Sequence, residues 1–275
     1  MSSPLVTFKD SDHSYKSKKK LTSVSSLYEN YHEKFDEDFI AKRSAIKNNF
    51  PKEYVRLKKI VKWDNPKLVT LFEDQKTLEE LAAKEKLKWF NKRELGTAFH
   101  KKQELEDIEV GRAVNEFDGT VFVTQEYKKT FDNQSLCNNL YELPDGYYPE
   151  LLIFNLKYGI AGQEDRVFIR TINGTRYDWL GDWKTDELVE FEPNFFSKRF
   201  YDPISHLFDT KGVQYTLKGS TYAWMLEEFG FKIDGISITN VKISDDLEII
   251  KRITHKVPYL KREVIDVVNH WKSKS

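Results

Sequence analysis

The stretch Pro149–Thr185, PELLIFNLKYGIAGQEDRVFIRTINGTRYDWLGDWKT, decides the fold. Within it, Asn173-Gly174 separates two runs rich in aromatic and β-branched residues, VFIRTI and TRYDWL. Asn-Gly between such runs is the strongest short-range signal for a β-hairpin with a two-residue type I′ turn. The sequence therefore predicts two antiparallel strands here, with Ile172 paired to Thr175.

The register of this hairpin groups charged side chains. Counting back from the turn, Asp165 faces Asp182, and Lys184 points to the same face two residues beyond Asp182. A second tight turn is expected at Lys157-Tyr158, and its register would place Glu150 opposite Asp165. Three adjacent strands would then carry one row of carboxylates with a lysine beside it.

A row of carboxylates has a chemical consequence. Directly opposed acidic side chains have Cβ atoms roughly 5 Å apart and repel each other. A fold retains such a row when a cation lies in it, and oxygen ligands suit a hard ion such as Mg²⁺ or Mn²⁺. The alternative is a solvated polar sheet face with an incidental Asp-x-Lys.

The composition restricts the class of protein. The 275 residues are 39% hydrophobic, and no apolar run approaches the roughly 18 residues that indicate a membrane span. The amino terminus lacks the apolar core of a signal peptide. The single Cys137 excludes a disulfide framework, a Cys-ligated zinc site and an iron–sulfur cluster. We therefore expect an intracellular protein without a membrane segment.

Charge is unevenly distributed along the chain. Lys and Arg exceed Asp and Glu in residues 1–100, and the reverse holds in residues 101–200. A basic part beside an acidic, metal-binding part suits a polyanionic substrate. The alternative is an ordinary charged helical surface.

Other segments have recognisable patterns. A short strand pair is predicted within residues 5–29, with its turn at Lys16–Lys20, followed by a helix capped by Ser23 or Ser25. Residues 36–95 are predicted to be largely helical. We expect two domains: residues 1–94, with the strand pair and a helical lobe, and residues 95–275, the core.

The second half of the chain alternates between predicted strands and helices. Strands are predicted over residues 119–125, 232–243 and 247–255. Helices are predicted over residues 126–140, 213–230 and 260–272. Residues 190–212 form a predicted loop whose aromatic side chains either stack on unpaired bases or pack onto the core.

His100 and Glu104 are four residues apart on a predicted helix and share a face. A histidine with an acid one turn later can complete a metal site whose other ligands come from strands elsewhere. The alternative is an ordinary surface pair.

Taken in order, these motifs resemble the PD-(D/E)XK nuclease superfamily. The closer similarity is to the RecB-like exonuclease branch, which includes the mitochondrial genome maintenance exonuclease and related phage nucleases. The resemblance rests mainly on four patterns: Gly96–His100 followed by Glu104, Glu150, Gly162–Asp165, and Asp182–Lys184. His13-Ser-Tyr15 and Leu21–Val24 also resemble phage members of the branch.

The resemblance implies an α/β (α+β) fold, a mixed central sheet flanked by helices. It implies metal ligation by His100, Asp165, Asp182 and the Trp183 carbonyl. It implies that Lys184 acts on the attacking water or stabilises the negative charge of the transition state. It makes Glu150 a catalytic acid and Glu104 a supporting one.

The covering helix departs from the family pattern. Members carry a Gln four residues before its tyrosine, whereas Lys218 precedes Tyr222 here. Gln214 lies one turn earlier and is the candidate substitute. We expect Gln214, Lys218 and Tyr222 to contact substrate.

The implied function is Mg²⁺-dependent hydrolysis of DNA, with Mn²⁺ as a substitute, at single-stranded ends. The implied setting is phage-type or organellar replication, recombination or repair, with replication or recombination proteins as partners. One alternative is a catalytically silent nuclease-fold module that binds DNA or a protein. Another is a sequence-specific endonuclease, although no separate base-reading element is evident. No Walker A motif is present, so a built-in ATP motor is not expected.

Overall fold

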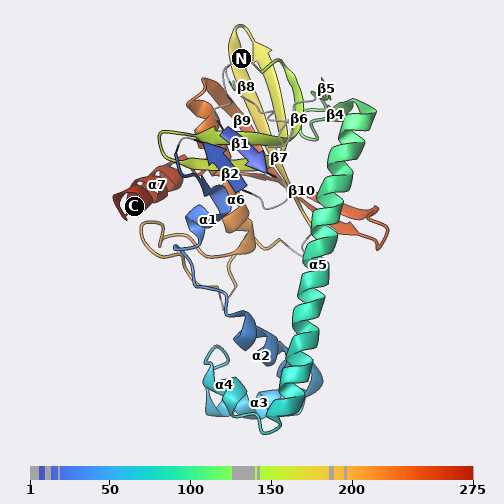
Figure 1. Cartoon of the computed structure of the whole chain (residues 1–275), viewed down its shortest axis with the longest axis vertical. Coiled ribbons are helices and arrows are strands. Elements are labelled where there is room, and N and C mark those ends of the chain that lie inside the picture. Colours follow the sequence, from blue (N-terminus) through green and yellow to red (C-terminus); the bar gives the residue numbers. More distant parts are fainter. Residues whose placement is uncertain are drawn as a thin grey trace. The chain divides into compact units, whose positions relative to one another are not determined.

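The computed structural model describes residues 6–9, 14–17, 19–125, 140, 143–185, 189–194 and 197–274 (Figure 1). The chain divides into two compact units. A sheet unit combines residues 1–32 with residues 99–275, and a helical unit comprises residues 33–98. We expected a boundary after residue 94 and grouped the amino-terminal strands with the helices. The structure instead places those strands in the sheet unit.

The helical unit is built from short helices and the first part of a long one. These are α2 (Glu37–Asn49), α3 (Pro51–Ile60), α4 (Lys67–Thr70) and the start of α5 (Gln75–Val110). Asp36 caps α2 by accepting from the Phe39 amide at 2.9 Å. Leu57, Leu68 and Leu78 are fully buried among these helices. The prediction of a largely helical segment over residues 36–95 is confirmed.

The sheet unit contains a six-stranded mixed sheet. Its strands are β3 (Thr22–Ser23), β6 (Gly146–Asn155), β7 (Ile160–Ile172), β8 (Thr175–Lys184), β9 (Phe231–Ile243) and β10 (Ile249–Val257). One edge of β7 pairs with β6, and its other edge pairs with β8 in the second half and with β3 at the start. β8 and β9 are parallel, whereas β9 and β10 are antiparallel. The predicted mixed sheet with flanking helices is confirmed.

Helices cover this sheet through one large apolar core. The core joins α1 (Val24–Tyr28), α6 (Lys211–Glu227) and α7 (Lys261–Lys274) to the strands. The predicted covering and closing helices are thus α6 and α7. β9 and β10 occupy the last two predicted strands. Among the described residues, no helix is long and apolar enough to cross a bilayer.

The central hairpin has the predicted register. Its pairs run from Ile172↔Thr175 to Arg166↔Gly181. Asn173 and Gly174 have φ values of 49° and 74°, so both adopt the left-handed conformation that a type I′ turn requires. The register of the preceding hairpin is also confirmed, since β6 and β7 pair around the turn that contains Lys157-Tyr158.

This second hairpin contains an irregularity that the prediction did not include. Pro149 pairs with Arg166 and Leu151 pairs with Glu164, while Glu150 between them has a left-handed φ of 54°. Tyr148 and Leu151 would point to opposite faces of a regular strand, yet both lie in the core with α6. The strand therefore exchanges its faces at Glu150, and because the pairs on either side keep the same register, it does so without the extra residue of a β-bulge.

The amino-terminal prediction was wrong in one respect. β1 (Val6–Lys9) and β2 (Ser14–Ser17) pair so that Val6 faces Ser17, which places the reversal between Lys9 and Ser14 and not at Lys16–Lys20. This register lets the rings of Phe8 and Tyr15 meet at 5.1 Å and buries Val6 and Phe8.

Several smaller expectations have clear outcomes. Ser23, the first of the two predicted caps, accepts from the Ser26 amide at 3.0 Å. The strand predicted over residues 119–125 is β5 (Val121–Val123), and it pairs with β4 (Arg112–Val114), which the sequence did not indicate. The predicted helix over 126–140, except Leu140, lies outside the described residues, as do His13 and Cys137. The loop over residues 190–212 buries Phe200 and Ile204 in the core.

Asp178 on β8 gives a first testable prediction. Its side chain is 1% exposed, and neither carboxylate oxygen has a hydrogen-bond partner in the described part of the chain. Burial, reinforced by Glu227, raises the pKa of Asp178 well above its usual value. The folded protein therefore keeps this proton to higher pH than the unfolded chain does. The resulting stabilisation is full below the unfolded pKa of about 4 and falls as pH rises toward the folded pKa.

We expect Asp178→Asn to stabilise the protein at neutral and alkaline pH, because the amide cannot ionise. Above the unfolded pKa, each unit by which the folded pKa exceeds it costs the wild type about 1.4 kcal/mol, which sets the scale of the gain. Urea unfolding between pH 5 and 9 measures it. Asp246→Asn, in an exposed turn, is the control. Equal pH dependence of Asp178→Asn and wild type would contradict the prediction.

Candidate metal centre

The candidate site lies where β7 and β8 separate. Their last backbone pair is Arg166↔Gly181, so Asp165 and Asp182 stand one position beyond the ladder. The backbone N–H of Trp183 donates instead to the carboxylate of Asp165 at 2.7 Å. From this point β8 continues beside β9 as far as Lys184↔Asn240, while β7 continues beside β6. The carboxylate thus takes a hydrogen bond that a strand partner would otherwise accept.

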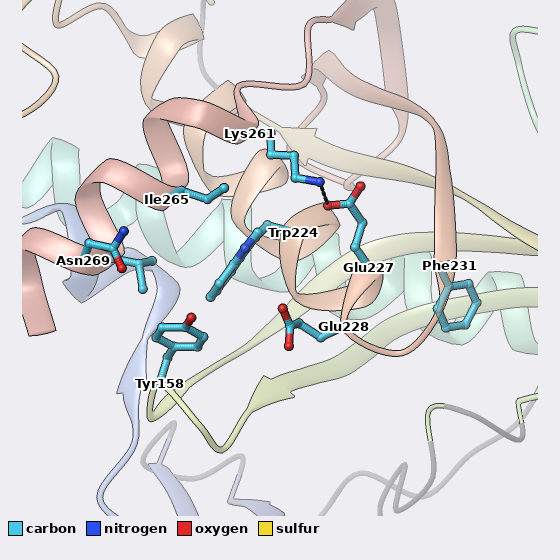
Figure 2. A pocket seen from close by; sticks show the side chains of 9 residues that line it. Tyr158, Trp224, Glu227, Glu228, Phe231, Lys261, Ile265 and Asn269 are labelled. Carbon is cyan, nitrogen blue, oxygen red and sulfur yellow. Dashed lines mark ion pairs between the residues drawn. The ribbon is translucent and has the colours of Figure 1, made fainter.

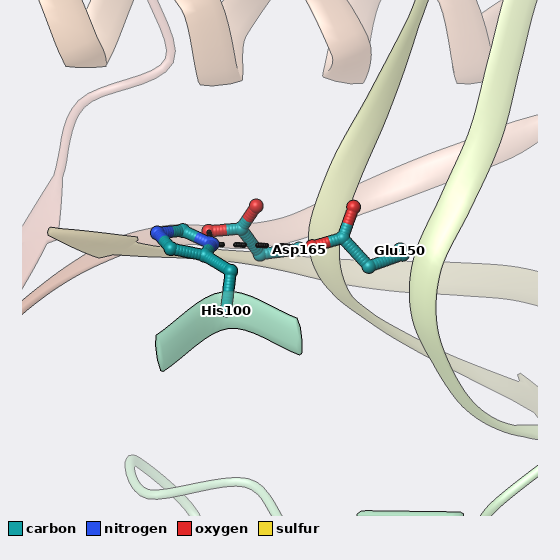
Figure 3. Close-up of side chains that lie close together, drawn as sticks. All are labelled: His100, Glu150 and Asp165. Atoms are coloured by element: carbon teal, nitrogen blue, oxygen red, sulfur yellow. Dashed lines mark ion pairs between the residues drawn. The ribbon is translucent and has the colours of Figure 1, made fainter. Parts of the chain in front are cut away.

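We call the place where β7 and β8 separate, with Asp165 and Asp182 on its two strands, the fork. His100, on the part of α5 that belongs to the sheet unit, points at it (Figure 3). Its Nδ1 lies 3.3 Å from Asp165 Oδ2 and 3.9 Å from Glu150 Oε1. One potential ligand atom from each of the three residues lies within 4.8 Å of the others. Phe99 packs edge-on against Trp183 at 6.0 Å, which fixes this turn of α5 against β8.

Lys184 occupies the other side of the fork. Its ammonium lies 2.6 Å from the Asp182 carboxylate and donates to the Trp183 carbonyl at 3.0 Å. Asp182 Oδ2 is buried and accepts no hydrogen bond from the described residues, although the ammonium is near. Of the four groups that the resemblance assigns to a metal, two meet at the cluster with Glu150. The oxygens of the other two, Asp182 and Trp183, contact Lys184.

Burial and opposite charges set the protonation of the cluster. Burial opposes a charge on His100, but Asp165 and Glu150 outweigh it and raise the pKa of the imidazole to about 10. Burial would likewise neutralise Asp165, but His100, Lys184 and the Trp183 amide lower the pKa of its carboxyl to about 2. Asp182 and Asp165 outweigh the burial of Lys184 and raise the pKa of its ammonium. When no metal is bound, protonated His100 and Lys184 therefore supply the positive charge that faces the carboxylates of the cluster.

The donor set fits a hard divalent cation. An imidazole nitrogen and two carboxylate oxygens lie within 4.8 Å of one another, and a cation between them would replace the positive charge that His100 carries when protonated. The buried, unbonded Oδ2 of Asp182 is a further oxygen donor beside them. His100, Glu150 and Asp165 are thus the residues that could hold a divalent cation.

Glu164 is a site residue that the sequence reasoning missed. It is 1% exposed, and its Oε1 has no hydrogen-bond partner among the described residues. Burial, with Asp182 and Asp165 close by, raises the pKa of Glu164 well above its usual value. Strict alternation along β7 would turn Glu164 away from Asp165 and Asp182, yet the charges of both aspartates act on it.

Two of the remaining predicted residues have other contacts. Glu104 forms an ion pair with Lys101 at 3.1 Å. Gln214 donates to Asp209 at 2.6 Å and lines a pocket of about 190 Å³ together with Lys218. Burial and the positive charge of Lys184 lower the pKa of Lys218. Lys218 is thus close enough to Lys184 for the two positive charges to repel each other.

Tyr222 explains the glycine of the Gly-x-x-Asp motif. The tyrosine is 9% exposed and packs over Gly162. A Cβ atom at Gly162 would lie 2.8 Å from Tyr222 Cζ and still closer to the hydroxyl. Only glycine allows α6 to place Tyr222 against this part of β7.

A second pocket, of about 540 Å³, is separate from the fork (Figure 2). Tyr158, Trp224 and Phe231 line it with Glu227, Glu228 and residues of α7. Lys261 forms an ion pair with Glu227 at 2.7 Å. None of the predicted site residues lines this pocket, and its two glutamates do not favour a polyanion.

Comparison of the chain with protein-family models, with curated proteins and with solved structures found no match. The function proposed for it therefore rests on the chemistry of the fork and on the resemblance of its motifs.

Metal binding should release a proton. His100 carries a proton at pH 7.5 because its pKa is about 10, and an imidazole must be neutral to bind a cation. We expect Mn²⁺ binding to release about one proton and to weaken as pH falls. Calorimetry in buffers of different ionisation enthalpy measures the release, and His100→Ala should bind Mn²⁺ weakly with no release. Undiminished affinity of His100→Ala, in a variant with a normal melting curve, would remove His100 from the site.

The contact of Tyr222 with Gly162 can be tested by a double-mutant cycle. Gly162→Ala should destabilise the protein by about 1–3 kcal/mol, because the added methyl overlaps a buried ring. Tyr222→Leu should relieve the overlap, so that Gly162→Ala costs much less in that background. Chemical denaturation of the four proteins gives the coupling energy. Additive effects would show that the two residues do not touch.

Proposed function

We propose that this protein is a metal-dependent nuclease that hydrolyses phosphodiester bonds of DNA. The observation that carries the proposal is the convergence of His100, Glu150 and Asp165 within 4.8 Å, beside Lys184 on the neighbouring strand. Ligands for a hard cation next to an ammonium group suit phosphate chemistry, because both neutralise negative charge on phosphoryl oxygens.

His100, Glu150 and Asp165 would hold the cation, and Asp182 with the Trp183 carbonyl would add oxygen donors. A bound Mg²⁺ or Mn²⁺ supplies Lewis acidity toward the phosphate and lowers the pKa of water. The Trp183 N–H donates to the Asp165 carboxylate at 2.7 Å and holds it facing His100. The ligands are thus arranged before an ion binds.

Lys184 has the complementary role. Its ammonium, held 2.6 Å from Asp182, is a preorganised donor for the negative charge that develops on the phosphoryl oxygens. Asp182 keeps Lys184 charged and in place. Because an ammonium has no lone pair, Lys184 acts on the phosphate or on the attacking water and not on the cation.

The resemblance to RecB-like exonucleases extends the proposal to single-stranded DNA ends. Replication and recombination proteins are then the expected partners. The excess of basic residues in the first hundred positions suits a polyanionic substrate.

Cleavage assays test the proposal directly. Purified protein is given end-labelled single-stranded, double-stranded and circular single-stranded DNA with Mg²⁺, Mn²⁺ or EDTA, and product lengths are measured. We expect shortening of linear single strands with either metal, and none in EDTA. Full cleavage by metal-stripped protein in EDTA would overturn the metal site. Binding without cleavage in every metal would favour a silent module, and equal rates on circles would exclude an exonuclease.

Lys184→Met separates the lysine from the ligands. Losing one preorganised donor costs about 10²–10³ in rate, so cleavage should fall by that factor while Mn²⁺ affinity is retained. The substitution also leaves Asp182 buried without its cation, which destabilises the metal-free protein. Mn²⁺ should therefore raise the melting temperature of Lys184→Met more than that of wild type.

Lys232→Met, an exposed position on β9, is the matched control and should behave as wild type in both measurements. Asp182→Ala should lose Mn²⁺ affinity as well as cleavage. A Lys184→Met enzyme that cuts at nearly the wild-type rate would reduce the lysine to a neutralising neighbour of the acids.

A further inference from the structure

Three lysines surround the ring of Tyr215. The ammonium of Lys184 lies 4.9 Å from the ring centroid, and those of Lys211 and Lys218 each lie 5.9 Å from it. Lys211, Tyr215 and Lys218 are spaced i, i+4 and i+7, so they share one face of α6. Lys184 reaches the same ring from β8.

Two of these lysines have no acidic partner of their own. Lys184 is paired with Asp182, but neither Lys211 nor Lys218 forms an ion pair with any residue the structure describes. The negative charges of Asp182 and Glu29 act on Lys218, but neither acid forms an ion pair with it. Two lysines that share this ring with Lys184 and form no ion pair of their own are suited to an anionic ligand, which removes the mutual repulsion of the three positive charges.

We propose that Lys211 and Lys218 bind successive backbone phosphates of a nucleic-acid strand, next to the phosphate that Lys184 serves. This proposal rests on the nuclease function and names how the strand is held. The two lysines are seven positions apart, or about 10 Å along α6, so they reach different phosphates of one strand. The compact, rotatable ammonium is a point charge for phosphate and carries no base preference.

The same residues explain the departure from the family pattern. Lys218 stands where the nucleases that the motifs resemble have a glutamine, so a full positive charge replaces a neutral amide. Gln214, the candidate substitute, already donates to Asp209. On this face of α6, the chain therefore carries a positive charge in place of the amide expected from the resemblance.

The salt dependence of binding tests the proposal without cleavage. A fluorescein-labelled thymidine 12-mer is titrated with protein in EDTA at several salt concentrations, and anisotropy gives the affinity. Lys211→Gln and Lys218→Gln should each lower affinity severalfold. Each should also reduce the slope of log K against log salt by about 0.7, the value for one phosphate of a single strand. Lys232→Gln should leave both unchanged, and Lys218→Arg should restore most of the loss.

The possible results separate this proposal from the nuclease function. Metal-dependent cleavage by wild type, with unchanged affinity and slope in both Gln variants, would overturn the lysine site alone. The expected slopes in a protein that never cleaves would support the site and overturn the nuclease. Inorganic phosphate at matched ionic strength should compete weakly. Displacement of the oligonucleotide by millimolar phosphate would overturn the assignment to a strand and indicate a small-anion site.

Discussion

The hydrogen bond from the Trp183 amide to the Asp165 carboxylate is the contact on which the site depends. Two paired strands can separate inside a protein only if the freed backbone groups find other partners. Here the partner is the side chain of Asp165, which is also a candidate ligand. The same hydrogen bond therefore satisfies the freed Trp183 amide and orients the Asp165 carboxylate. The space that this opening leaves is where His100 and Lys184 enter.

The opposite face of the same strands holds the fork rigid. The guanidinium of Arg166 lies 4.8 Å from the ring of Trp183 and forms an ion pair with Glu116 at 3.0 Å. Glu116 in turn binds Arg252 at 3.2 Å and Thr254 at 2.9 Å, both on β10. Charged groups thus connect β7 to β10 behind the site, while apolar packing with α6 covers the other face. Asp165 and Asp182 thus lie between an ion-paired network on one side and the apolar core on the other.

Much of this arrangement follows from local sequence, and the rest does not. The Asn173-Gly174 turn determines a register over many residues, so Asp165 and Asp182 could be placed from sequence alone. The left-handed conformation of Glu150 could not, because no short-range signal marks a glutamate with positive φ inside a strand. Glu164 was missed as well, because alternation along β7 gives no reason to group it with its neighbour Asp165. The partner of Tyr222 was missed for a related reason, since a close approach to Gly162 is a tertiary contact.

The position of Trp183 has an optical consequence. Its indole is 5% exposed and lies between the Phe99 ring and the Arg166 guanidinium, while its own amide and carbonyl touch the two charged sides of the fork. Indole emission responds to the local electric field and to nearby quenchers. Exchange of a proton for a divalent ion at His100 would change that field, so the chain contains an intrinsic fluorophore at its candidate centre. With six tryptophans present, the difference spectrum against Trp183→Phe isolates this signal.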